Sequence, residues 1–168
     1  QSFCNFVAMQ ERHPRLIVLQ TLSKAWGLAG IRLGMLFAHE AVAQVVNNVK
    51  APYNVNKLTS RVARQAVATG QARLAENLAQ IVSERARVSA ALAAFDFVEK
   101  VYPSDSNFVL FKLTAATDAL KVYRDIAAAG VVIRYRGTQL HCENCLRATI
   151  GTPEENAAML TKLQAVVG

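Results

Sequence analysis

The hydrophobic pattern changes period repeatedly in the second half of the chain, and this change limits the possible folds more than any other feature. Short apolar runs typical of strands occupy residues 97–102, 107–112, 131–135 and 146–150. A segment with helical spacing over 116–129 ends before a glycine, and a last helix begins near residue 152 with an N-cap, a first-turn proline and acidic residues that suit the helix dipole. We therefore expect an α/β unit of three or four strands with helices from about residue 96 onward.

The first part of the chain contains a shorter version of the same pattern. The β-branched run 16–19 follows Pro14 and predicts a buried strand, and 31–38 predicts a second strand. Residues 20–30 contain two glycines and are too few for a crossover helix, so they predict a loop with about one helical turn. A helix is expected over 39–50.

Two further helices are predicted over 57–69 and 71–95, with a glycine between them. A helix of about 25 residues is nearly 40 Å long at about 1.5 Å per residue, which is enough to link two lobes. We expect residues 1–56 to be the end of a large domain, 57–95 to be interdomain helices, and 96–168 to be a small α/β domain. Two strands and one helix cannot cover both faces of a parallel sheet, and the chain opens at Gln1, so the large domain is expected to be truncated.

Composition narrows the class of protein. Hydrophobic residues make up 52% of the 168 residues and charged residues 18%, which supports a packed core. The net charge of +7 raises the possibility of an anionic partner, but the basic residues are spread along the chain, which argues against nucleic acid. There is no apolar run long enough for a membrane span and no signal peptide pattern, so a cytoplasmic protein without a membrane partner is expected.

A possible metal or redox motif lies at His141-Cys142-Glu143-Asn144-Cys145. One C-x-x-C with a neighbouring histidine supplies at most three ligands, and there is no second cluster, so we expect no metal site. A hairpin loop with two reduced thiols is the favoured interpretation, with Cys4 as a lone third cysteine.

The segment around Lys24 combines residue types that suit covalent cofactor chemistry. An amine at the end of a strand needs a neighbouring site for the cofactor phosphate. Thr21 and Ser23 offer hydroxyl groups, and Arg32 offers the fork of donors that suits a phosphate dianion. An isolated lysine of this kind is ordinarily a solvated loop residue, so the functional interpretation of Lys24 depends on the surrounding pattern. A nucleotide-binding phosphate loop is the other alternative, but its pattern G-x-x-x-x-G-K-[ST] is absent.

That pattern resembles the lysine signature of fold type I pyridoxal-phosphate aminotransferases, and it reads Ser23-Lys24-Ala25-Trp26-Gly27-Leu28-Ala29-Gly30-Ile31-Arg32-Leu33-Gly34. The resemblance implies a fold type I α/β structure, of which this chain is the C-terminal part: a remnant of the large-domain sheet, a long linking helix and a small C-terminal domain. It also implies pyridoxal 5'-phosphate as cofactor, with Lys24 as the catalytic lysine that binds it covalently and moves a proton. Ser23 and Arg32, assisted by Thr21, would bind its phosphate. Trp26 is expected to be a packing residue.

Within this family the chain is similar to the histidinol-phosphate aminotransferases, on four blocks of sequence: 51–56, 106–109, 130–134 and 146–156. The resemblance implies that Arg147 and Arg134 bind acidic groups of the substrates, and that Asn107 lies in a segment that approaches them. Tyr53 is expected to be a packing residue that could line the cleft. For Arg134 an ion pair with a surface carboxylate stays an alternative, because Arg136 is predicted on the same face of its strand.

The implied reaction is transamination between histidinol phosphate and 2-oxoglutarate, with glutamate as the partner product, in a homodimer. The aspartate and tyrosine that bind the cofactor ring in complete members lie in an Asp-x-x-Tyr segment, and none occurs between Gln1 and Leu19. The fragment alone is therefore expected to be inactive. Alternatives are an aromatic or aspartate aminotransferase, a phosphoamino-acid decarboxylase of the same fold, or a non-catalytic binding domain.

Overall fold

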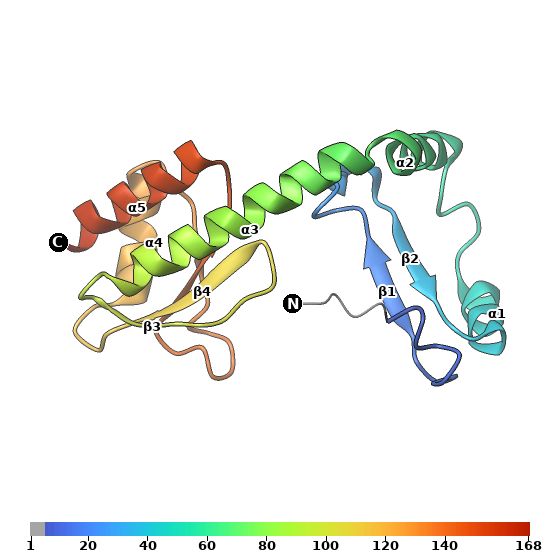
Figure 1. Ribbon diagram of the computed structural model, residues 1–168. Helices are drawn as coiled ribbons and strands as arrows, with labels where there is room; N and C mark the ends of the chain where they lie inside the picture. Colours follow the sequence, from blue (N-terminus) through green and yellow to red (C-terminus); the bar gives the residue numbers. More distant parts are fainter. Residues whose placement is uncertain (1–5) are drawn as a thin grey trace. The chain divides into compact units, whose positions relative to one another are not determined.

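The computed structural model describes residues 6–168 and divides into two compact units, one that ends at Ala75 and one that comprises Glu76–Gly168 (Figure 1). The long helix α3 (Gln71–Ala93) begins in the first unit and continues into the second. Gly70 separates it from the preceding helix α2 (Lys57–Thr69), as the sequence predicts. The expected mixture of strands and helices is confirmed.

The first unit is built on an antiparallel pair of strands. β1 (Val18–Thr21) pairs with β2 (Gly34–Phe37) along its whole length. The loop between them contains the 3-10 turn η1 (Ala29–Ile31), which confirms the predicted helical turn. Helix α1 (Glu40–Val49) follows β2 and precedes α2.

Two predictions for this unit are wrong in detail. The first strand begins at Val18, and its Leu19 is 75% exposed, so the strand is not buried among the described residues. The second strand is shorter than 31–38, because Ile31 ends the 3-10 turn and Arg32 has a left-handed backbone with φ 55°. A left-handed residue cannot continue a strand, so pairing starts only at Gly34.

The second unit contains a four-stranded sheet in the order β3-β4-β6-β5, in which all neighbours are antiparallel. The strands are β3 (Val98–Val101), β4 (Phe108–Leu113), β5 (Arg134–Tyr135) and β6 (Cys145–Thr149), and the helices are α4 (Ala119–Ala128) and α5 (Pro153–Val167). Three of the four predicted strands lie where expected. The fourth shrinks from 131–135 to two residues, because Val131 N still donates to Ile126 O at the end of α4.

One face of this sheet forms the core. Along β4, Val109, Phe111 and Leu113 are fully buried while their neighbours are only half-buried, which is the alternation of a strand covered on one face. The core cluster adds residues of three helices and of the neighbouring strand β6; they are Val88 and Leu92 of α3, Ala119, Val122 and Ile126 of α4, Met159 and Leu163 of α5, and Leu146 and Ala148 of β6. The helices therefore cover one face, and the opposite face is left for other contacts.

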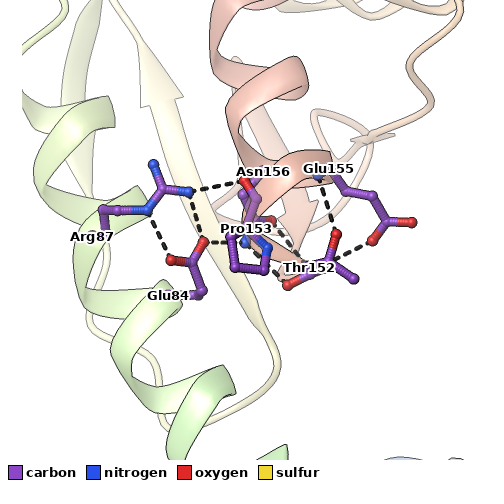
Figure 2. A network of polar contacts seen from close by, with 7 residues as sticks. Glu84, Arg87, Thr152, Pro153, Glu155 and Asn156 are labelled. Atoms are coloured by element: carbon purple, nitrogen blue, oxygen red, sulfur yellow. Dashed lines mark hydrogen bonds and ion pairs between the residues drawn. The ribbon is translucent and has the colours of Figure 1, made fainter.

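A buried polar network joins α3 to α5 (Figure 2). Glu84 accepts hydrogen bonds from Arg87 at 2.9 and 2.6 Å and from the Asn156 amide at 2.7 Å. At the start of α5, the side chain of Thr152 accepts from Glu155 N, while that of Glu155 accepts from Thr152 N, which is a capping box. The predicted helix start is thus confirmed.

Asn144 explains the motif that the sequence offered as a metal or redox candidate. Its amide donates to three carbonyls, of Leu113, Thr114 and Thr117, at 2.9–3.1 Å, and its carbonyl oxygen accepts from Ala119 N. Cys142 and Cys145 are free thiols, and Cys145 is the buried first residue of β6 and not part of the loop. Cys4 lies outside the described residues.

Two candidate features are absent from the described part of the chain. No group of three or more His, Cys, Asp or Glu side chains in residues 6–168 lies close enough together to hold a metal ion. None of the described helices combines the length and the apolar character that crossing a membrane requires.

Candidate functional site

Lys24 lies in a tight turn directly after β1. Gly27 N donates to Lys24 O at 2.8 Å, and Gly27 adopts φ 66°, a conformation that favours glycine. Leu28 N donates to the carbonyl of the buried Leu22, which closes the turn behind the lysine. The side chain of Lys24 is exposed, and among residues 6–168 it has no ion pair or hydrogen bond. The turn thus presents a free amine on a fixed backbone.

Two hydroxyl groups lie together next to this amine. The Thr21 hydroxyl donates to Ser23 Oγ at 2.8 Å, and Ser23 N donates to Thr21 Oγ1 at 3.1 Å. Arg32 is exposed at the other end of the loop and donates once to Ala29 O. A guanidinium carries five N–H donors, so several remain for an anion. Thr59 Oγ1 of α2 donates to Ile31 O at 3.2 Å and ties the loop to the helix.

Trp26 packs as expected near the junction of the two helices. It is half-buried, and a side chain at Gly70 would meet its ring at 3.2 Å and the carbonyl of Ala66 at 2.6 Å. Tyr53 differs from its expected packing role, because it is 96% exposed with φ 58°. A side chain that contacts so little of the described chain contributes little to its core.

The second unit brings three arginines to one face of its sheet. Arg134 of β5 is directly opposite Arg147 of β6, and Arg136 N donates to Cys145 O at 2.9 Å. Directly opposed residues share a face, and so do residues two apart along an extended strand. The core residues Leu146 and Ala148 alternate with Arg147, so the arginines lie on the face opposite the core.

Arg147 is held in place, but in the described part of the chain no carboxylate pairs with its charge. Its Cζ lies 4.8 Å from the centre of the Phe108 ring. Its Nε is buried without a hydrogen bond. Burial lowers the pKa of Arg147, and the charges of Arg136 and Arg134 lower it further. A desolvated guanidinium beside two like charges is an arrangement that an anion stabilises.

Asn107 lies next to this cluster, one residue before Phe108, and its carbonyl accepts from Ile150 N at 2.8 Å. The contact anchors the start of β4 to the end of β6. The sequence places Arg136 on the face of Arg134 without indicating a role for it, and it does not indicate Phe108. Strand alternation from Arg134 was the signal for Arg136, whereas the ring contact depends on register across two strands and has no signal in one sequence.

Comparisons with known proteins give a consistent result. Residues 2–163 match the model of a family described as aminotransferase class I and II. A histidinol-phosphate aminotransferase from Flavobacterium johnsoniae is 47% identical over 154 residues, which is 92% of this chain and 43% of that protein.

Two solved structures share the fold. The histidinol-phosphate aminotransferase from Sinorhizobium meliloti, in complex with pyridoxal-5'-phosphate, has a TM-score of 0.77 and 26% identity over 91% of this chain and 41% of its own. A decarboxylase from Sulfurospirillum multivorans has a TM-score of 0.89 and 26% identity over 99% of this chain and 48% of its own. The α/β fold class is confirmed, and the chain spans a little under half the length of these proteins.

Proposed function

The chain belongs to the class I and II aminotransferase family, and we propose that it is the C-terminal part of a pyridoxal-phosphate-dependent histidinol-phosphate aminotransferase. The reaction transfers the amino group of histidinol phosphate to 2-oxoglutarate, with glutamate as product, in histidine biosynthesis. The observation that carries the proposal is the unpartnered Nε of Arg147 beside two further arginines, because both substrates are anions. The similarity to the Flavobacterium johnsoniae enzyme supports the choice of substrate.

The residues after β1 fit the cofactor in donor chemistry. Lys24 offers a free amine, Ser23 offers the O–H that remains to it while it accepts from the supporting Thr21 hydroxyl, and Arg32 offers its unused guanidinium N–H groups. Pyridoxal phosphate, when bound, supplies the electron sink that weakens bonds to the amine-bearing carbon. Lys24, on the turn closed by the Gly27 N to Lys24 O bond, would hold the cofactor through its side-chain amine and would be the group that moves a proton at the substrate carbon.

Arg147 and Arg134 bind the anionic groups of the substrates. A guanidinium donates two parallel N–H bonds to a carboxylate or a phosphate, so one pair of arginines serves histidinol phosphate and 2-oxoglutarate in turn. Phe108 holds Arg147 from the side, which leaves the edge of the guanidinium for the ligand. Asn107 and Tyr53 are also part of this proposal, in which both contact the substrate.

The proposal includes the domain organisation and the oligomeric state of the protein. Residues 1–56 form the end of the cofactor-binding domain, 57–95 the linking helices and 96–168 the small domain. The active protein is a cytoplasmic homodimer that includes the cofactor-ring aspartate and tyrosine, and the chain of 168 residues has little activity by itself. Light scattering of the full-length enzyme tests the dimer; a monomer that is fully active excludes it.

Borohydride reduction tests the cofactor site. The full-length enzyme is incubated with pyridoxal phosphate, reduced and digested, and the label is expected on Lys24. Lys24→Ala should lose both the label and the visible absorbance band, whereas Lys57→Ala should keep them. If the full-length protein shows no such band, it is a non-catalytic binding domain and the enzyme proposal fails.

A decarboxylase is the second candidate, because the Sulfurospirillum multivorans structure shares the fold. Assays of the full-length enzyme with histidinol phosphate, phenylalanine, aspartate and a phosphoamino acid separate the alternatives. Amino transfer to 2-oxoglutarate that is fastest from histidinol phosphate supports our proposal. Release of carbon dioxide without amino transfer supports the decarboxylase.

A further inference from the structure

Within the described residues 6–168, no carboxylate forms an ion pair with the three arginines on the sheet face opposite the core. The ion pairs found among residues 6–168 involve other cations, namely Arg85, Arg87, Lys112 and Lys121. Arg134 and Arg147 are directly opposite each other, and like charges in that position destabilise a sheet. The cluster is therefore arranged for a ligand of more than one negative charge.

Arg136 is the member of this cluster that the proposed function does not use. Its backbone N–H donates to Cys145 O, so the pairing with β6 continues to Arg136. Arg136 is two residues from Arg134 and therefore lies on the same face of the sheet. Gly137 follows, and a side chain there would collide with the Tyr135 ring, which packs against the core. The backbone around Arg136 is thus held from the core side, and its half-buried side chain belongs to the face of Arg147.

The charge of the ligand decides whether a third arginine is useful. A carboxylate carries one charge and is satisfied by one bidentate guanidinium. A phosphate monoester dianion carries two charges and three terminal oxygens, so it can accept from several guanidinium groups at once. We propose that Arg136 is a specificity-determining residue, which joins Arg134 and Arg147 in binding a phosphate dianion in preference to a carboxylate. This inference rests on the proposed function, in that the phosphate belongs to the amino donor.

The 168-residue chain itself provides the test, by NMR titration at pH 8 with ethyl phosphate and with propionate. The wild-type chain is expected to prefer ethyl phosphate. Arg136→Gln should weaken ethyl phosphate binding about tenfold and propionate binding less than about threefold, since a charge-assisted hydrogen bond is lost only from the phosphate complex. Arg136→Met is measured alongside, because it keeps much of the aliphatic stem, and Arg124→Gln on α4 is the matched control.

A pH arm distinguishes charge recognition from a structural role. The second pKa of a phosphate monoester is about 6, so the wild-type preference should grow from pH 5 to pH 8, and this growth should shrink in both Arg136 variants. Cys145, opposite Arg136, stays neutral over this range because burial raises its pKa. The proposal is overturned if the wild-type chain shows no preference, if both ligands weaken equally, or if ethyl phosphate binding is unchanged.

The two proposals fail separately. The titration needs no cofactor, whereas the borohydride experiment needs no intact substrate site. If Lys24 is labelled but the Arg136 variants lose no preference for ethyl phosphate, only the inference about Arg136 fails. Selectivity at Arg136 without label on Lys24 leaves a phosphate-binding face and removes the aminotransferase assignment.

Discussion

The side-chain amide of Asn156 donates a 2.7 Å hydrogen bond to Glu84, and this contact connects helix α5 to the long helix α3. The same amide donates to Gly151 O, and the Asn156 carbonyl oxygen accepts from Gly151 N. Gly151 follows β6 by two residues. One side chain thus links both helices to the end of the strand that carries Arg147.

Asn156→Ala should destabilise the second unit by about 2 kcal/mol, because buried partners lose their hydrogen bonds without replacement. Asn156 is 2% exposed, so water cannot substitute. Urea unfolding followed by circular dichroism measures the change. Lys162→Ala, an exposed position on the same helix, should change the free energy of unfolding by less than about 0.5 kcal/mol. Equal effects of the two variants would contradict the role of Asn156.

Glu84 should make stability depend on pH in the acid range. Hydrogen bonds from Arg87 and then Asn156 lower the pKa of Glu84 from 4.5 to about 2, against a smaller opposing effect of burial. The folded state therefore binds fewer protons than the unfolded state between these values. The contribution is fully present above about pH 4.5 and is lost as the pH falls toward about 2.

Urea titrations between pH 2 and 6 measure this dependence. Glu84→Gln should flatten the slope below pH 4.5, since an amide does not titrate. Glu76→Gln, at an exposed position on the same helix, should leave the slope as in the wild type. A slope that is the same in all three proteins would show that Glu84 is not the responsible group.

Asn144 gives a prediction about the cysteine motif. Asn144→Ala should cost about 2–4 kcal/mol, because three carbonyls and one N–H lose their partner and a left-handed residue with φ 57° becomes alanine. Asn144→Asp keeps the acceptor and shape but loses the donors, so it should also destabilise. Cys142→Ser should have an effect below about 0.5 kcal/mol in thermal or urea unfolding. If the cysteine variant were the more damaging one, the thiols and not the amide would organise this turn.

Gly70→Ala should destabilise the first unit by about 1–3 kcal/mol, through overpacking between two helices. The new methyl group would lie 2.6 Å from the Ala66 carbonyl and 3.2 Å from the Trp26 ring. Gly30→Ala is the matched control, because nothing lies within 4 Å of a side chain there. The fluorescence of Trp26, the single tryptophan of the chain, reports the local change during urea unfolding. A shift of Trp26 emission in the control and not in Gly70→Ala would contradict this packing.

The sequence predicts what depends on local pattern. Helix bounds such as 57–69 and the N-cap at Thr152 follow from periodicity and from the residue types of a helix start, so they are confirmed closely. The lysine loop is likewise contiguous, and its residue types are sufficient to suggest its chemistry. The site roles of Lys24 and Arg147 remain predictions that the experiments above test.

What the sequence does not predict depends on contacts between distant residues. Asn144 bonds to carbonyls 27–31 positions away, so the sequence favoured a loop with two reduced thiols and gave no sign that an amide organises the turn. Arg147 meets Phe108 only because two strands share a register. The run that includes Leu19 has the residue types of a buried strand, yet Leu19 is exposed. Its burial depends on which segment covers the strand pair β1-β2, and the run itself does not specify that segment. Local pattern thus indicates elements, while their partners follow only from the assembled fold.

Phe108 supplies the last prediction, because its ring holds Arg147 at 4.8 Å. Phe108→Leu keeps an apolar side chain but removes the face of the ring, so the guanidinium gains freedom that ligand binding must then remove. In the full-length enzyme the KM for histidinol phosphate should rise about 3- to 10-fold with little change in kcat, since a cation–π contact of about 0.5–1 kcal/mol or more is lost before chemistry begins. Phe97→Leu is the matched control, because that ring stacks on Phe95 on the core side. A fall in kcat without a change in KM would place Phe108 in the chemical step and contradict its role as a support for Arg147.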